Sequence, residues 1–186
     1  MKIRLAAYLQ SDSIVDGEGI RTVIWTQGCP HHCLGCHNPE TWSFDEGEMV
    51  DVDLVCDIID TLEAQDGITF SGGDPFMQPA ECAYIAKYAR SKGLNIWSYT
   101  GYYYEELLEL AKKKPAIMDF LKELDVLVDG RFVLSKKSFT CTFRGSTNQR
   151  IIDVKESLKK KKVVLIDKYE HKEEVSNRKR TPGVYI

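Results

Sequence analysis

Segments typical of β-strands and of α-helices alternate along most of the chain, and this alternation restricts the possible folds more than any other feature. Stretches rich in β-branched and aromatic residues predict strands, which we place at residues 22–26, 68–71, 95–100, 124–128, 150–154 and 163–166. Stretches with apolar residues at helical spacing lie between them, at 51–63, 82–89, 104–113 and in the Lys-rich stretch before the last strand. Strands separated by such helices predict right-handed βαβ units and a parallel sheet.

The length of the chain limits how many such units it holds. Its 186 residues correspond to one domain, whereas a closed barrel of eight units typically needs about 250 residues. We therefore expect an α/β fold in which about five to six units form a partial, open parallel (β/α) barrel. The single domain is expected to span residues 1–186, and the residues from about 155 on form a C-terminal segment to which no motif assigns a role.

The composition excludes several classes of protein. Hydrophobic residues make up 43% of the chain, which is enough for a core and excludes a disordered protein. The formal net charge of −3 argues against broad binding to nucleic acid, and the basic runs at 159–162 and 178–180 are interpreted as solvated surface. Polar residues interrupt the apolar start of the chain, and no apolar run approaches about 18 residues, so neither a secretory signal nor a membrane span is expected. These features predict a cytoplasmic protein.

The six cysteines are distributed unevenly along the chain. Cys29, Cys33 and Cys36 lie within eight residues, directly after the strand predicted at 22–26. Because disulfides are rare in a reducing cytosol, this cluster indicates a metal site. The other three are far apart and are expected to be small buried hydrophobic residues; they are Cys56, Cys82 and Cys141.

The number of clustered cysteines limits the kind of metal site. A structural zinc site usually takes four ligands, and an ordinary [4Fe–4S] cluster takes four thiolates. Three thiolates leave one iron with an open position, to which a substrate can bind directly. A zinc knuckle completed by His31, His32 or His37 is the alternative, although His31 and His32 are each expected at the loop surface.

Two further polar motifs also follow predicted strands. Gly72-Gly73-Asp74 stands directly after the strand at 68–71, and Asp129 ends the strand at 124–128. The carboxyl ends of parallel strands meet at one edge of a sheet, so these motifs and the clustered cysteines are expected to form one site. Asp129 either helps to position a ligand or caps the following turn, and the sequence leaves both interpretations open.

The spacing C-x3-C-x2-C is the signature of the radical S-adenosylmethionine enzymes, and further motifs narrow the resemblance. In chain order these motifs occupy residues 15–21, 36–42, 97–102, 126–130 and 144–150. Together they resemble the activating proteins of anaerobic ribonucleoside-triphosphate reductases, a family within the subgroup that activates glycyl-radical enzymes. The resemblance runs from about Asp16 to Arg150 and covers most of the chain.

The resemblance implies two cofactors. It implies that Cys29, Cys33 and Cys36 bind a [4Fe–4S] cluster, whose fourth iron is chelated by the amino and carboxylate groups of S-adenosyl-L-methionine. The residues implied to bind that cofactor are Gly35, Cys36 and His37 near the adenine, and Gly72, Gly73 and Asp74 at the methionine end. Glycines let the backbone approach a ligand closely, and a carboxylate accepts charge-assisted hydrogen bonds from an ammonium group.

The resemblance also implies the reaction and its partners. An external one-electron donor, such as a flavodoxin or ferredoxin, reduces the cluster, S-adenosylmethionine is cleaved, and the resulting radical takes a hydrogen atom from one glycine of the reductase. The cofactors carry this chemistry, so no catalytic side chain is expected. An activator of pyruvate formate-lyase or of another glycyl-radical enzyme is the nearest alternative, and a zinc-binding regulatory module is a remote one.

Overall fold

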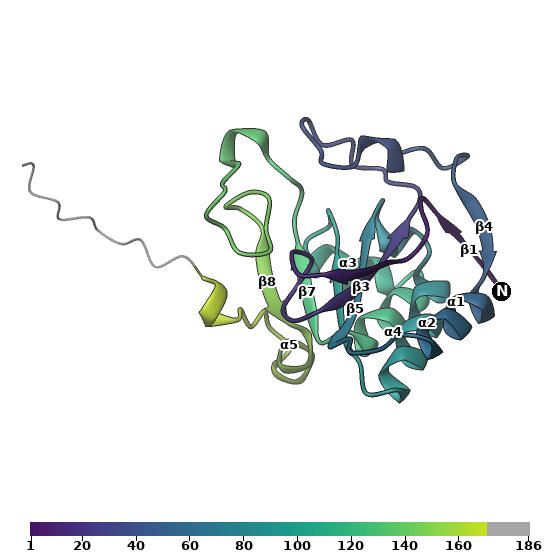
Figure 1. Cartoon of the computed structure of the whole chain (residues 1–186). Helices are drawn as coiled ribbons and strands as arrows, with labels where there is room; N and C mark the ends of the chain where they lie inside the picture. Colours follow the sequence, from purple (N-terminus) through teal and green to yellow (C-terminus); the bar gives the residue numbers. More distant parts are fainter. Residues whose placement is uncertain (171–186) are drawn as a thin grey trace, which may run out of the picture.

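The structure is a computed structural model that describes residues 1–170. Its basis is one eight-stranded sheet with helices packed against it (Figure 1). The strands are β1 (Lys2–Leu5), β2 (Gln10–Ser13), β3 (Arg21–Thr26), β4 (Glu48–Asp51), β5 (Gly67–Gly72), β6 (Asn95–Tyr99), β7 (Val126–Asp129) and β8 (Arg150–Asp153). The helices are α1 (Val52–Asp60), α2 (Pro79–Ser91), α3 (Tyr104–Ala111), α4 (Ala116–Glu123) and α5 (Val154–Lys160). The basic run at 178–180 lies outside the described residues.

The four strands β3, β5, β6 and β7 are parallel neighbours, so the predicted parallel α/β sheet is confirmed. The outer strands differ from the prediction. On one side β1, β2 and β4 pair antiparallel, and on the other side β8 pairs antiparallel with β7. Because β4 and β8 stand at opposite ends of the strand order, the sheet formed by residues 1–170 is open. Its parallel part consists of these four strands instead of five or six units.

The antiparallel direction of β8 has a local cause. A parallel return needs a long crossover, usually a helix, but residues 130–149 between β7 and β8 contain no α-helix. The chain therefore turns back beside β7. The strand predicted at 163–166 is also wrong, because this segment forms only a single bridge, between Leu165 and Ile152.

The helices match the predicted segments with one addition. The Asp51 side chain caps α1 by accepting a hydrogen bond from the backbone N–H of Asp53. The helix predicted at 104–113 is followed by a further helix, α4, whose N-cap residue is Pro115. Proline often follows the end of a helix and is also well tolerated at the start of one, so Pro115 by itself does not distinguish the two. Within residues 1–170, no helix combines the length and the apolar composition needed to cross a membrane.

The sheet has packed side chains on both faces. Between the sheet and the helices, Phe120 of α4 contacts Phe70 of β5 and Phe76, with ring centroids 5.1 and 4.9 Å away. On the opposite face, Trp97 of β6 packs with Tyr169 in a smaller apolar cluster. Successive residues of a strand point to opposite faces, which explains how β6 contributes to both layers.

Arg21 is buried at the end of the sheet where the parallel strands begin. Its guanidinium donates hydrogen bonds to Thr69 Oγ1 at 2.7 Å and to the carbonyls of Ile68 and Asn95 at 2.8 and 2.9 Å. Burial lowers the pKa of Arg21 to about 10, so the group is still charged at neutral pH. These bonds join β3 to β5 and β6 at this end of the sheet, so Arg21 has a structural role.

Candidate functional site

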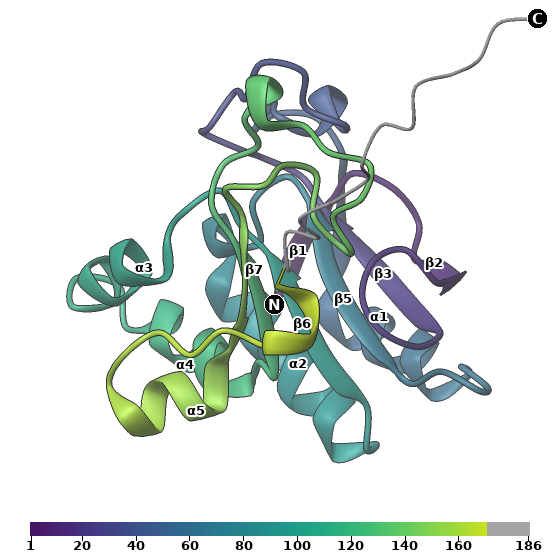
Figure 2. The ribbon, with the colours of Figure 1, turned by 90° about the vertical axis from the view of Figure 1, so that its left-hand side faces the viewer.

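A cavity of about 560 Å³ lies at the carboxyl end of the parallel strands. Two loops, residues 27–47 and 130–149, lie over this end of the sheet (Figures 1 and 2). Of the predicted site residues, the cavity is lined by Cys29, Cys33, Cys36, His37, Gly72, Gly73 and Asp74. The fold therefore brings the motifs that follow separate strands into one place, while their roles as ligands remain predictions.

The cysteine triplet, Cys29, Cys33 and Cys36, belongs to a loop that is anchored at its base. The backbone N–H of Cys29 donates to the carbonyl of Trp42 at 3.0 Å, and Cys36 N–H donates to the carbonyl of Cys33 at 3.0 Å. The Asn38 N–H points at Cys36 Sγ from 3.4 Å. All three thiols are half-buried and free. The loop thus presents three unpaired sulfur ligands to the same cavity.

The chemistry of this donor set fits an iron–sulfur cluster. Burial raises the pKa of Cys29 to about 11 and raises the pKa of Cys33, so these thiols are protonated at neutral pH and release their protons when a metal binds. Within the described part of the chain, no three His, Cys, Asp or Glu side chains converge on one metal ion. The thiolates of a cluster bind different irons and need no such convergence.

The Gly72-Gly73-Asp74 turn packs directly on the start of the cysteine loop. Gly73 N–H donates to the carbonyl of Thr26 at 2.7 Å, and Asp74 N–H donates to the carbonyl of Gly28 at 2.9 Å. A Cβ atom on Gly73 would lie 2.5 Å from the Gly28 oxygen, and Gly72 has a φ of +94°. Glycine is required here because the two loops touch backbone to backbone. The two motifs form one rigid unit.

Asp74 is buried, with 1% of its surface exposed, and its carboxylate is surrounded by donors. Oδ1 accepts from the Phe76 N–H at 3.0 Å, and Oδ2 accepts from the Gly101 N–H at 3.0 Å. The Thr100 hydroxyl lies 2.9 Å from Oδ2, and His31 Nε2 lies 2.8 Å from the same oxygen. Since a carboxylate only accepts hydrogen bonds, Nε2 of His31 carries the proton. Neither Thr100 nor His31 was identified from the sequence as a partner of Asp74.

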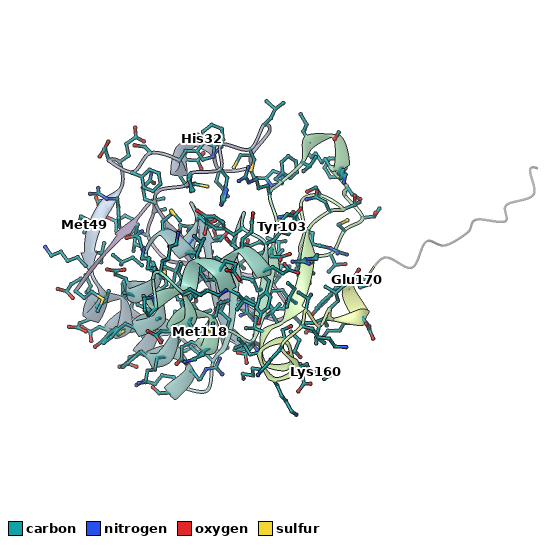
Figure 3. The ribbon with its side chains drawn as sticks, turned by 180° about the vertical axis from the view of Figure 1, so that it is seen from behind. His32, Met49, Tyr103, Met118, Lys160 and Glu170 are labelled. Atoms are coloured by element: carbon teal, nitrogen blue, oxygen red, sulfur yellow. The ribbon has the colours of Figure 1, made fainter. Side chains whose placement is uncertain are left out.

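The two neighbouring histidines of the cysteine loop have different positions. The His31 side chain is only 3% exposed, so its predicted place at the loop surface is wrong. Its ring packs edge-on against Tyr102 with centroids 4.5 Å apart. His32 is exposed as predicted, on the loop at the top edge of the sheet (Figure 3), and its ring contacts Trp42 at 4.9 Å. The contact of His31 with Asp74, which belongs to a distant segment of the chain, distinguishes His31 from His32.

The third cysteine is flanked by Gly35 and His37, which the resemblance placed near the adenine. The His37 ring lies 5.1 Å from the ring of Phe132, and both approach Gly145. Gly35 has a φ of +77° and packs against Leu134 instead of lining the cavity. Phe132 is a cavity-lining aromatic that the sequence analysis missed, because its only signal is its position shortly after the strand end at Asp129.

The motif at 144–150 forms a wall of the cavity through its own hydrogen bonds. Gln149 Oε1 accepts from the N–H groups of Gly145 and Ser146 at 2.9 and 3.1 Å. Gln149 Nε2 donates to the carbonyl of Gly130 at 3.0 Å, which folds the loop back onto the end of β7. The glutamine therefore fixes the shape of this wall.

The structure decides between the two interpretations of Asp129. Asp129 is fully buried, accepts the Tyr104 N–H at 2.8 Å and pairs with Arg150, so it caps α3 and does not face the cavity.

Cys56 and Cys82 are buried as predicted. Cys141 is not, because it is partly exposed and lines the cavity.

The site combines three thiols on one loop with a Gly-Gly-Asp turn beside them, and three thiolates imply one iron with an open position for a ligand. These features define an iron–sulfur enzyme of the radical S-adenosylmethionine class. A family model described as a 4Fe-4S single cluster domain matches residues 15–152. The chain belongs to the family of anaerobic ribonucleoside-triphosphate reductase-activating proteins. The predicted family, enzyme class and iron–sulfur cofactor are thereby confirmed.

Two relatives illustrate the similarity. The activating protein of Haemophilus influenzae is 33% identical over 155 residues, which cover 77% of this chain and 96% of the relative. That of Escherichia coli K12 is 36% identical over 145 residues, which cover 73% and 90%. Among solved structures, QueE from Escherichia coli aligns with a TM-score of 0.44 and 14% identity, over 54% of this chain and 53% of the other.

Proposed function

We propose that this chain generates a glycyl radical on an anaerobic ribonucleoside-triphosphate reductase. One observation carries the proposal: the hydrogen bond from Asp74 N–H to the Gly28 carbonyl joins the Gly-Gly-Asp turn to the cysteine loop, so both motifs face one cavity. The two relatives indicate the partner, since both are activating proteins of that reductase.

The proposed cofactor sites use residues that approach this cavity. The cysteine triplet would hold the [4Fe–4S] cluster, and S-adenosylmethionine would bind at Gly35, Cys36, His37, Gly72, Gly73 and Asp74. When bound, these cofactors supply a one-electron cleavage that yields a carbon radical able to take a hydrogen atom from glycine. The open position on the fourth iron explains why three cysteines are enough.

The remaining residues of the site bind the cofactors and line the cavity, and none is needed as an acid or a base. Residues of the loops at 27–47 and 130–149 line the cavity, and Phe132 beside His37 offers an aromatic surface to the adenine. Glycines in the turn let backbone groups approach the ligand. The chain therefore acts by positioning its cofactors.

We also propose that residues 1–186 form a single domain. Support comes from the end of the described chain, where Lys168 and Tyr169 both donate to Glu18 Oε2, at 2.5 and 2.7 Å. Leu158 of α5 packs against the main core. Residues 155–170 therefore belong to the same body as the strands.

The proposed setting follows from the same chemistry. Three free thiols need a reducing compartment, which supports the cytoplasm. Reduction of the cluster needs an external one-electron donor, for which a flavodoxin or ferredoxin is proposed. The net charge of −3 offers no basis for binding nucleic acid, and we propose no membrane partner.

The test is electron paramagnetic resonance on an anaerobic mixture of the reduced protein, S-adenosylmethionine and the reductase. A glycyl-radical doublet is expected, and it should be absent when the acceptor glycine of the reductase is replaced by alanine. A doublet with pyruvate formate-lyase but not with the reductase would reject the proposed partner. If no radical and no 5′-deoxyadenosine were formed, the proposed chemistry would be rejected as well.

A further inference from the structure

Oδ2 of the Asp74 carboxylate has no free acceptor position. Each oxygen of an ionised carboxylate offers about two lone-pair sites, and Oδ2 faces three protein donors, the Gly101 N–H, the Thr100 hydroxyl and His31 Nε2, while Oδ1 accepts from the Phe76 N–H. With 1% of the residue exposed, water does not compete. An amino group can therefore donate to Oδ2 only if one of these donors leaves.

His31 is the donor that can leave at the lowest cost. The Phe76 and Gly101 donors are backbone groups, fixed by the short 3-10 helix after Asp74 and by the end of β6. Thr100 is held by its own N–H, which donates to the Val128 carbonyl at 3.0 Å. His31 instead reaches Asp74 by a side chain from a loop without regular secondary structure.

The surroundings of His31 also permit this movement. The ring lines the cavity, so it can swing away from Asp74 without opening the apolar core. A Cβ atom on Gly101 would lie 2.3 Å from the ring, so the absence of a side chain there is what lets the imidazole reach the carboxylate. The imidazole ring of His31 thus lies beside Asp74 and inside the cavity.

We propose that His31 occupies the place beside Asp74 Oδ2 that the amino group of S-adenosylmethionine takes, and that His31 is displaced when this ligand binds. This inference rests on the proposed function, because it takes Asp74 as the residue that binds the methionine end. His31 is a positioning residue in this account: it keeps the buried carboxylate satisfied until the ligand arrives. Because it stands between Cys29 and Cys33, the exchange links the cysteine loop to the ligand site.

The test is equilibrium binding of S-adenosylmethionine to the cluster-loaded protein and to its His31→Ala variant. Removing the competing donor is expected to lower the dissociation constant about ten- to a hundredfold, the worth of one hydrogen bond to a charged group. His32→Ala is the matched control, because His32 is the exposed neighbour and contacts Trp42 instead of Asp74. It is expected to leave the affinity unchanged, and the iron content of both variants verifies that the cluster site is folded.

A second ligand separates displacement from a general change of the pocket. 5′-Methylthioadenosine shares the adenosine and the sulfur but has no amino group, so His31→Ala is expected not to change its affinity. Unchanged or weaker binding of S-adenosylmethionine to His31→Ala would overturn the inference, as would equal tightening for both ligands. Failure of the wild-type protein to bind S-adenosylmethionine would count against the proposed function itself.

Discussion

Burial raises the pKa of the Cys29 thiol to about 11, and the nearby negative charge of Asp74 acts in the same direction. The pKa of Cys33 is also raised by burial. In the iron-free protein these thiols are neutral at pH 7, which makes a half-buried group of sulfur atoms tolerable without a metal. Cluster assembly must release their protons, so at the scale of the residue the site is prepared for a metal and stable without it.

The iron-free protein is expected to lose stability as the pH rises from about 9 to about 11. The folded state keeps the Cys29 proton in this range, whereas the unfolded thiol titrates near 9.0. The unfolded state then binds fewer protons, so the free energy of unfolding decreases with pH. Denaturant unfolding across this range measures the slope, which is expected to be shallower in Cys29→Ala. Equal slopes in the two proteins would contradict the assignment.

Replacing any residue of the cysteine triplet by alanine is expected to abolish an oxygen-labile cluster of about four irons. Cys56→Ala and Cys82→Ala serve as controls, because their thiols are buried outside the cavity. Cys141→Ala is also expected to retain the cluster, although Cys141 lines the cavity. Iron and sulfide analysis of anaerobically reconstituted protein gives the answer, and iron loss in Cys141→Ala would contradict the three-cysteine ligand set.

At the scale of the element, the end of each parallel strand decides what the following loop can do. β3 ends at Thr26 and β5 ends at Gly72, which are paired neighbours in the sheet. The loops that follow them therefore start side by side, and the turn after β5 bonds to the backbone of the cysteine loop. The contact leaves no room for side chains between the two loops.

Gly73→Ala is expected to separate these two loops. The new methyl group would lie 2.5 Å from the Gly28 oxygen, and overpacking of this kind typically costs about 1–3 kcal/mol. Both the melting temperature and the affinity for S-adenosylmethionine are expected to fall. Gly93→Ala is the control: Gly93 has a φ of +84° but no atom within 4 Å of the added methyl group, so only stability should decrease. Normal ligand affinity in Gly73→Ala would show that the contact is dispensable.

At the scale of the whole molecule, the two ends of the parallel strands have separate tasks. The carboxyl ends carry the cavity, and the starts are joined by Arg21, whose partners are carbonyl and hydroxyl groups instead of a carboxylate. Lys168 and Tyr169 attach the end of the described chain to Glu18 near this point. The ligand site can therefore remain open while the opposite end of the sheet supplies stability.

Arg21→Met is expected to lower the free energy of unfolding by at least about 2 kcal/mol, because it leaves several buried acceptors without a donor. Thr69 Oγ1 and the Asn95 carbonyl lose the Arg21 donor in this variant, and Thr69 keeps only its hydrogen bond to the Asp16 carbonyl. Denaturant unfolding of the iron-free protein measures the loss. The folded fraction is expected to bind the cluster normally, since Arg21 does not line the cavity. An unchanged unfolding midpoint would show that this end of the sheet does not depend on Arg21.

Local patterns in the sequence were enough to predict the parallel strands, the helix α1 and the grouping of the strand-end motifs. Each of these depends on residues close together in the chain, through side-chain periodicity or cysteine spacing. The direction of β8 and the existence of α4 were missed. A strand pattern does not encode its direction, and Pro115 suits the end of one helix as well as the start of the next.

The amino-acid sequence by itself determined that three thiols and a Gly-Gly-Asp turn follow strands of a parallel sheet, because spacing and strand order are properties of the chain. Only the tertiary structure decided which donors satisfy Asp74. His31 and His32 are adjacent histidines with the same local environment in sequence, yet one is buried against a carboxylate 43 residues away and the other is exposed. Such a contact arises from the packing of β5 and β6 beside β3, since only the folded sheet brings these loops within hydrogen-bond distance.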